Sequence, residues 1–256
     1  MSGSIASAGN PLKKSNDRSC APPRFKQIGG NLIPFCGDPF DLVCRAAMMT
    51  VKWKSLTVGL HYEGSMNQPK GIEPFFEPLE SLQRLLTRFD DRGVIIGGIA
   101  VSVLGKARFT EDLDAMFLLS TQDIPRLLEA AKEEGIEPRI ENAAEFARKN
   151  RVVLLKHVIT NTNIDISLGV LPFEQEIVER SVLHQIDAAL QIRLPTPEDL
   201  IILKAVAHRP KDMEDIRILA EKYPNLDIAR IEHWIKSFGE VLEMPALWDD
   251  IAELFK

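Results

Sequence analysis

Apolar residues begin to recur with a helical period after residue 75, and from there the pattern predicts alternating helices and strands. The stretch "EPLESLQRLLTRFDDRG" carries an apolar stripe with the spacing of an amphipathic helix, and Gly93 is expected to end it. The stripe consists of Leu79, Leu82, Leu85, Leu86 and Phe89. The run "VIIGG" predicts a first strand, which leads into a short apolar helix over residues 99–104.

A second strand, a helix and a hairpin follow. The apolar run "DLDAMFLL" predicts a strand, and "TQDIPRLLEAAKEEG" predicts a helix with Thr121 as N-cap and Gly135 as C-cap. The segment "RVVLLKHVITNTNIDISLGV" predicts two strands joined by the turn "TNTN". In its second arm apolar residues alternate with Asp165 and Ser167, so one face of that strand packs in the core and the other carries a carboxylate.

The chain after Pro195 reads as helical throughout. Thr196 is a good N-cap with Pro197 at the first helical position, so "TPEDLIILKAVAH" predicts a helix that is apolar nearly all round and therefore buried. Pro210 is expected to end it. Three further helices are predicted in "KDMEDIRILAEKYP", "LDIARIEHWIKSF" and "PALWDDIAELF", where Trp234 and Trp248 are expected to be core residues.

These elements predict an α+β (α/β) fold with a small mixed sheet flanked by helices and a helical C-terminal subdomain. We divide the chain into a poorly structured leader (1–65), a core (66–180) and a helical subdomain (181–256). The leader shows no lasting period, so Met66 could be the natural start. It is basic, with eight Lys or Arg against four Asp or Glu, whereas the rest is acidic, which disfavours a broad nucleic-acid surface.

The remaining bulk features indicate a cytoplasmic protein with no membrane partner. Cys20, Cys36 and Cys44 are all the cysteines of the chain, and their spacing matches no zinc or redox motif. The first thirty residues contain no apolar signal-peptide region, and the apolar runs elsewhere are too short and too often broken by glycine to cross a bilayer.

Two aspartates at the head of an apolar strand are the first candidates for chemistry. Asp112 and Asp114 are two residues apart, so their side chains point to the same side about 7 Å apart. Two ionised carboxylates this close repel each other unless a cation lies between them. Mg²⁺ (or Mn²⁺) suits them because it binds a few carboxylates together with phosphate oxygens, and Asp165 on a later strand can supply a third ligand.

A glycine pair supplies a matching anion site. Gly97 and Gly98 end a strand and open a helix, whose free N–H groups can bind phosphate. Arg108 could hold phosphate oxygens bidentately, and Thr110 could fix the turn or donate a hydroxyl. Lys204 lies in an otherwise apolar helix, where an ammonium must either reach the surface or meet an anion such as phosphate or Asp.

In this combination the chain resembles the nucleotidyltransferases of the DNA polymerase beta superfamily. Their signature is a Gly-Gly or Gly-Ser pair opening a helix, then Asp-x-Asp, then a third Asp on a later strand. The order here is the same. Arg108 and Thr110 before the aspartates, and "PEDLIILKAVAHRPKDMEDI" after them, resemble the branch that includes the AbiEii-type toxins. In that branch a helical Lys and an Arg-x-Lys-Asp-x-x-Asp run recur, here Lys204, Arg209, Lys211, Asp212 and Asp215.

The resemblance implies transfer of a nucleoside monophosphate from a nucleoside triphosphate to an acceptor hydroxyl, with release of pyrophosphate. Asp112, Asp114 and Asp165 would be the catalytic and metal-binding residues, and Gly97, Gly98, Arg108, Thr110 and Lys204 would bind the nucleotide. The acceptor stays open among RNA or tRNA, a protein and a small molecule. A toxin role would add an antitoxin protein as partner.

Other interpretations of the same residues stay open at this point. The pocket could bind nucleotide without catalysis, as in a regulatory or interaction module, or the acids could be solvated residues of a plain α/β scaffold. Asp212 and Asp215 have a structural interpretation, because Asp212 is a natural N-cap after Pro210 and Asp215 is a first-turn acid that suits the helix dipole. His208 at a helix end is expected to be a cap or surface residue.

Overall fold

The computed structural model describes residues 24–28, 31–35 and 71–255, and the chain divides into two units, 1–37 and 38–256. In the first unit β1 (Arg24–Ile28) pairs antiparallel with β2 (Asn31–Phe35). The rest of the predicted leader, with its three cysteines, lies outside the described residues, and so does the candidate start Met66.

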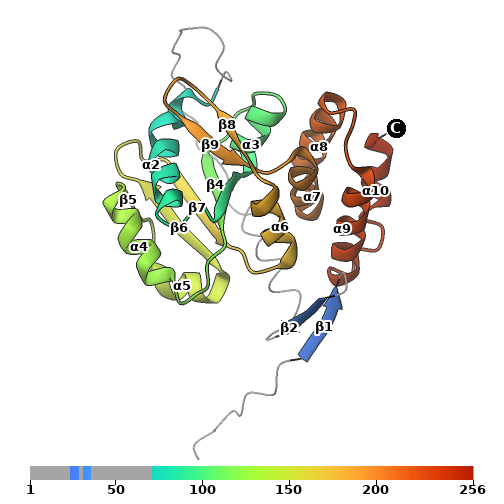
Figure 1. Ribbon diagram of the computed structural model, residues 1–256, viewed down its shortest axis with the longest axis horizontal. Helices are drawn as coiled ribbons and strands as arrows, with labels where there is room; N and C mark the ends of the chain where they lie inside the picture. The colour runs from blue at the N-terminus through green and yellow to red at the C-terminus, as the bar shows by residue number, and fades with distance from the viewer. Residues whose placement is uncertain (1–23, 29–30, 36–70, 256) are drawn as a thin grey trace, which may run out of the picture. The chain divides into compact units, whose positions relative to one another are not determined.

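The second unit is built on a five-stranded sheet with the order β3-β4-β7-β6-β5 (Figure 1). β4 and β7 run parallel, and every other neighbouring pair in this sheet is antiparallel, so the sheet is mixed as the sequence predicts. The strands are β3 (Gly93–Ile96), β4 (Asp112–Phe117), β5 (Ile136–Pro138), β6 (Val152–His157) and β7 (Asn163–Leu168).

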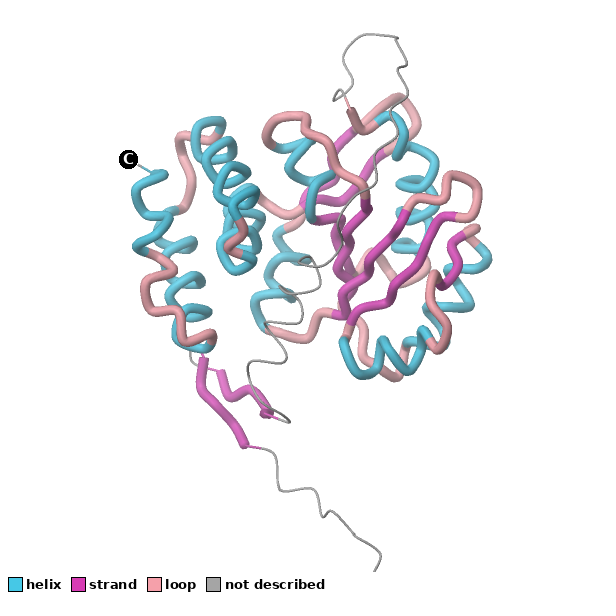
Figure 2. The backbone as a smooth tube through the Cα atoms, turned by 180° about the vertical axis from the view of Figure 1, so that it is seen from behind, coloured by secondary structure: helices cyan, strands magenta, loops and turns pink. Residues whose placement is uncertain are grey.

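Three helices cover one face of this sheet. They are α2 (Phe76–Thr87, preceded by the 3-10 turn η1, Glu73–Phe75), α4 (Ile124–Glu133) and α5 (Ala143–Asn150), and Figure 2 shows them behind the strands. Phe117 of β4 meets Phe89, just after α2, with ring centroids 6.1 Å apart. Because side chains alternate along a strand, Leu113 and Ala115 are buried on this face with Phe117, whereas Asp112 and Asp114 point to the other.

The remaining helices lie to the right of β4 in Figure 1. They are α3 (Gly97–Leu104), α6 (Pro172–Arg180), α7 (Pro197–Ala207), α8 (Pro210–Lys222), α9 (Ile228–Val241) and α10 (Asp249–Ala252), followed by the 3-10 turn η2 (Glu253–Phe255). Residues 181–256 begin with the hairpin β8 (Val182–Gln185) and β9 (Gln191–Leu194), which lies against β3, so the helices of this segment start at Pro197.

The apolar helix α7 lies between α8 and α9, which explains why nearly every side of it is apolar. Its buried Asp199 accepts hydrogen bonds from Arg230 of α9 and Arg180 of α6, so one carboxylate joins three helices. Trp234 is buried against Phe173, with centroids 4.9 Å apart. Trp248 is half-buried and stacks on Phe255.

The predicted N-caps of α7 and α4 differ in outcome. Thr196 Oγ1 accepts from the Asp199 N–H at 3.2 Å, as predicted. Thr121 is not the N-cap of α4, because the helix starts only after Asp123, whose carboxylate turns back to accept from the N–H and hydroxyl of Ser120. The sequence pattern did not predict β5, α5 or α6. In α5 only Ala143 and Ala147 are buried, which leaves no apolar stripe to detect.

None of the helices in the described part of the chain combines the length and apolar composition that crossing a bilayer requires.

Candidate active site

The parallel pairing of β4 with β7 places the three predicted carboxylates side by side. Asp114 lies directly opposite Asp165 in the strand register, and Asp112 lies opposite Asn163. Asn163 donates from Nδ2 to Asp112 Oδ1 at 3.1 Å. Residues two apart share a face of a strand, so Asn163 and Asp165 face the same side as Asp112 and Asp114. Asp112, Asp114 and Asp165 all keep partial solvent contact.

Negative charge is concentrated near the start of β4 and β7. Burial raises the pKa of Asp114 to about 6, and the negative charges of Asp165 and Asp112 act in the same direction, against the opposing positive charges of Lys204 and Arg209. Burial also raises the pKa of Asp165, although a hydrogen bond from Arg139 opposes this. Carboxylates that resist ionisation in this way favour binding of a cation.

Arg139 already supplies one positive charge. This residue follows β5, and its Nη1 lies 2.5 Å from Asp165 Oδ1 and donates to the carbonyl of Leu155 at 3.3 Å. Asp165 is therefore held by an ion pair, whereas the Asp112 carboxylate accepts a neutral amide. Within the part of the chain that the structure describes, no group of three His, Cys, Asp or Glu side chains could hold a metal ion.

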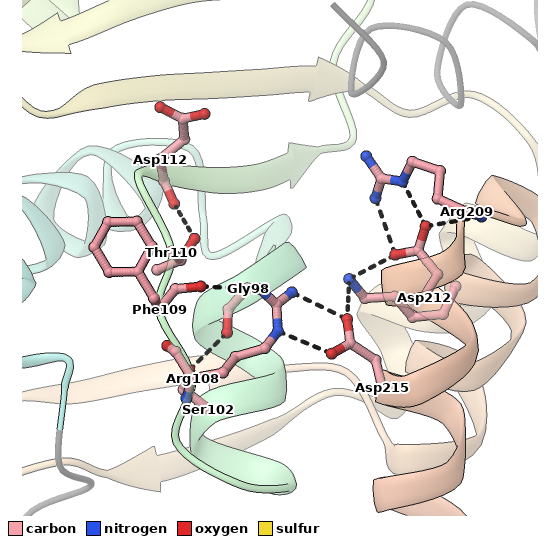
Figure 3. Close-up of polar contacts among 10 residues, drawn as sticks. Gly98, Ser102, Arg108, Phe109, Thr110, Asp112, Arg209, Asp212 and Asp215 are labelled. Carbon is pink, nitrogen blue, oxygen red and sulfur yellow. Dashed lines mark hydrogen bonds and ion pairs between the residues drawn. The ribbon is translucent and has the colours of Figure 1, made fainter. Parts of the chain in front are cut away.

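The glycine pair lies directly beneath the acids. Gly97 has φ +66°, and a Cβ there would lie 1.9 Å from Asp114 Oδ2, so only glycine leaves room for this carboxylate. A Cβ on Gly98 would lie 2.4 Å from Thr110 Oγ1. Thr110 in turn donates to the carbonyl of Asp112 at 3.2 Å, which fixes the turn into β4 (Figure 3). The start of α3 thus lies within van der Waals reach of the carboxylate site.

The first residues of α3 keep backbone N–H groups available for an anion. The residue before the helix is Ile96, whose apolar side chain cannot accept a hydrogen bond as a cap. Ser102 Oγ donates to the carbonyl of Gly98 at 2.9 Å and so occupies an acceptor rather than a donor of the first turn. Free N–H groups at a helix start favour anions such as phosphate.

A buried ion-pair network, which we call the Asp212/Asp215 network, borders the site on the helical side (Figure 3). Arg108 binds Asp215 with both ends of its guanidinium, Nε at 2.8 Å and Nη2 at 3.0 Å. Lys204 Nζ lies 2.9 Å from Asp215 and 3.2 Å from Asp212. Arg209 also donates to Asp212, at 2.9 Å from Nη2. The network joins the loop before β4 to α7 and α8.

The contacts of this network define the environment of Asp212, Arg108 and Lys204. Burial alone would raise the pKa of Asp212, but the hydrogen bond from Arg209 and the charge of Lys204 hold it below its usual value. The prediction that Asp212 is the N-cap of α8 is wrong: Arg209 is the N-cap, and Asp212, the third residue of the helix, accepts from the Arg209 N–H at 3.2 Å. Arg108 and Lys204, predicted to bind phosphate, lie beside the site with their charges paired to these acids.

The structure therefore brings Asp112, Asp114, Asp165, Gly97, Gly98 and Thr110 together, with Arg108 and Lys204 in the adjoining network. Sequence reasoning missed Arg139 and Asn163. Asn163 carried a usable signal, because it lies two residues before Asp165 and must share its face of the strand. Arg139 carried none, because its contact depends on a strand, β5, that the pattern did not reveal.

Solved structures with a similar fold include two nucleotidyltransferase-related proteins. An antigenic nucleotidyltransferase-like protein from Paracoccidioides brasiliensis is 15% identical with a TM-score of 0.43, over 70% of this chain and 92% of that one. ANT(2″)-Ia, solved in complex with adenylyl-2″-tobramycin, is 15% identical with a TM-score of 0.34, over 70% of this chain and 99% of that one. At these identities and TM-scores the likeness carries no argument about what this chain does.

A comparison with curated proteins finds no match. A family model does match, over residues 74–244, which include every residue of the candidate site. Its description is "Nucleotidyltransferase of unknown function (DUF6036)", and it names neither the AbiEii branch nor a toxin. The match covers well over half of the chain, and the chain belongs to this family of nucleotidyltransferases.

Proposed function

We propose that this protein is a metal-dependent nucleotidyltransferase that moves a nucleoside monophosphate from a nucleoside triphosphate to an acceptor hydroxyl. The observation that carries the proposal is the contact between the glycine pair and the acids: Gly97 adjoins the Asp114 carboxylate, and Asp165 lies opposite Asp114. The proposed anion site and the proposed cation site are then adjacent, and a triphosphate with a bound metal ion needs both.

The donor set fits a divalent cation. Asp112 and Asp114 offer hard carboxylate oxygens on one face of β4, and the raised pKa of Asp114, caused by burial and by the charges of Asp165 and Asp112, is what carboxylates lacking a counter-cation show. Mg²⁺ commonly takes only one or two protein carboxylates and completes its shell with water and substrate phosphates. Asp112 and Asp114, with Asp165 beside them, therefore suffice for Mg²⁺ or Mn²⁺.

Each residue of the candidate site has its own role in the proposed transfer reaction. A cation held by Asp112 and Asp114 would supply Lewis-acid stabilisation of the phosphate charge and lower the pKa of the acceptor hydroxyl. The N–H groups of Gly97 and Gly98 donate to oxygens of the leaving diphosphate, and Arg108 and Lys204, oriented by Asp215, stabilise the same charge from the helical side. Asp165 accepts the hydroxyl proton as the acceptor oxygen bonds to the α-phosphorus and the bond to pyrophosphate breaks.

The direct test is label transfer. The protein is incubated with each α-labelled nucleoside triphosphate and Mg²⁺, first alone, then with total tRNA, then with a cell extract. We expect label to move to one acceptor pool and pyrophosphate to appear in equal amount, with both lost in Asp112→Ala and Asp114→Ala. Nucleotide binding without transfer to any pool would instead favour the non-catalytic binding module. Label transfer that persists in both variants would contradict the proposal.

A toxin role and an antitoxin partner stay predictions of the AbiEii resemblance. They are tested separately, by inducing the chain in a bacterial host and comparing growth with that of the Asp114→Ala variant. Growth arrest that needs Asp114 would support a toxin.

Gly97→Ala is expected to remove activity through Asp114. The new Cβ would overlap the carboxylate, so Asp114 must move, and even outer-shell disturbances of metal ligands cost about 10- to 100-fold in affinity or activity. The matched control is Gly135→Ala, because Gly135 has a similar φ of +72° but an added Cβ there meets nothing within 4 Å. Both variants carry the same backbone strain, so equal losses of label transfer would contradict the contact-based explanation.

Arg139→Gln is expected to strengthen divalent-cation binding. A unit positive charge about 6 Å from a divalent ion repels it by roughly 1.4 kcal/mol even at the dielectric constant of water, or about tenfold in affinity. Titration with Mn²⁺, followed by the electron paramagnetic resonance of the free ion, measures this. The control is Arg217→Gln, which removes an exposed arginine paired with Glu214 on α8. Weaker Mn²⁺ binding in Arg139→Gln would show that Arg139 acts chiefly by holding Asp165 in place.

A further inference from the structure

Phe109 is an exposed aromatic residue within the candidate site. Its side chain is 75% exposed, although it lies between Arg108 and Thr110, whose side chains are both fixed. Arg108 is held by Asp215 and donates from Nη1 to the Phe109 carbonyl at 3.1 Å, and Thr110 adjoins Gly98. A single exposed apolar residue needs no explanation on an ordinary surface, but this one is presented by a rigid segment beside the proposed phosphate site.

The charges around the site indicate how a bound nucleotide is oriented. In Figure 3 the ring of Phe109 lies on the opposite side of Gly98 from Arg209 and Asp212. The Asp212/Asp215 network together with Lys211, in the first turn of α8, carries a net positive charge, because four basic residues (Arg108, Lys204, Arg209 and Lys211) face two acids. Partial burial and the charge of Arg209 lower the pKa of Lys211, although Asp212 opposes this. The terminal phosphates of a triphosphate carry most of its negative charge, so they favour the side of this network, and the nucleoside then extends toward Phe109.

We propose that Phe109 is the platform on which the base of the bound nucleoside triphosphate stacks. The proposal rests on the proposed function, since it needs a nucleotide in the site. Stacking on an aromatic ring suits every base, because each base has a π-face, and a phenyl ring offers no hydrogen bond to read a base edge. Selection at this residue then follows stacking area, which favours purine over pyrimidine triphosphates.

The test compares two ligands that share phosphates and differ in the base. Binding of ATP and of inorganic tripolyphosphate, each with Mg²⁺, is measured by calorimetry for the wild type, Phe109→Ala and Phe109→Trp. For ATP we expect a Kd about 5- to 150-fold higher in Phe109→Ala and near the wild-type value in Phe109→Trp, the range that base–aromatic stacking spans. For tripolyphosphate we expect the same Kd in all three proteins.

The control variant is Ile159→Ala. Ile159 is 76% exposed on the turn between β6 and β7 and has no aromatic ring, so its removal should leave ATP binding unchanged. An equal loss in Ile159→Ala, or an equal loss of tripolyphosphate binding in Phe109→Ala, would overturn stacking. Unchanged ATP binding in Phe109→Ala would overturn it while leaving the proposed function intact. A wild type that binds neither ligand would overturn both proposals.

Discussion

Asp114→Asn is expected to abolish nucleotidyl transfer while making the metal-free protein more stable. The asparagine side chain is close in size and shape but carries no charge, so the proposed cation site loses a ligand with little change in packing. We expect label transfer to fall by more than about 100-fold, because even the outer-shell partners of metal ligands are worth about 10- to 100-fold. Circular dichroism checks the expectation that the variant keeps the fold.

The stability gain has a defined pH dependence. The pKa of Asp114 is raised to about 6 by burial and by the charges of Asp165 and Asp112, so between about pH 4 and pH 6 the folded wild type binds a proton that the unfolded chain releases. Wild-type stability therefore falls as the pH rises through this window. Asn carries no such penalty, and above pH 6 the variant should be more stable by at most about 3 kcal/mol.

The measurement is urea unfolding in EDTA across this pH range. Below pH 4 the two proteins should have nearly equal stability, because Asp114 is then neutral in both states. Asp123→Asn is a useful contrast, since hydrogen bonds from Ser120 lower the pKa of Asp123 and its loss should destabilise the protein above pH 4. A constant difference between wild type and Asp114→Asn from pH 4 to pH 7 would mean that the Asp114 charge is not the cause.

Lys204→Met is expected to be the most destabilising of the single substitutions considered. Lys204 is buried with its ammonium between Asp212 and Asp215, and removing one member of a buried ion pair costs about 3–5 kcal/mol because a buried charge loses its partner. Arg209 and Arg108 still neutralise the two acids, so we expect about 3 kcal/mol, the lower end of the range. In a domain of this size that lowers Tm by about 6–12 °C.

Lys236→Met is the matched control. Lys236 pairs with Glu232 one helical turn away and is 57% exposed, and such surface pairs contribute at most about 0.5 kcal/mol. Differential scanning calorimetry of both variants separates the effect of the buried network from that of losing a lysine. A Tm for Lys204→Met no lower than that for Lys236→Met would mean that the Asp212/Asp215 network contributes little to stability.

Patterns within one element predicted much of the fold. The alternation in β4, the glycine pair at the start of α3 and the Thr196 cap all follow from residues a few positions apart, and each can be read directly from the sequence. The sequence also indicates that Lys204, in an apolar helix, must find an anion or reach the surface. It could not name Asp215 as that anion, since the choice depends on how α7 packs against α8.

The contacts that the sequence could not predict are those set by strand order. The sequence predicts Asp165 as the third carboxylate but not its place opposite Asp114, because that place depends on β7 lying beside β4 in parallel and a hairpin pattern alone leaves that neighbour undefined. Arg139 reaches Asp165 across β6, from a strand of three residues with a single buried side chain. Such contacts need the three-dimensional sheet, because no local period encodes them.

The pairing of Arg108 with Asp215 has a consequence for the timing of synthesis. The two residues are 107 positions apart, so at about 5–20 residues per second a ribosome makes the second about 5–20 s after the first. Until α8 emerges, Arg108 lacks its carboxylate partner and the helical side of the candidate site is absent. A growing chain therefore carries all three acids and the glycine pair before the candidate site is complete.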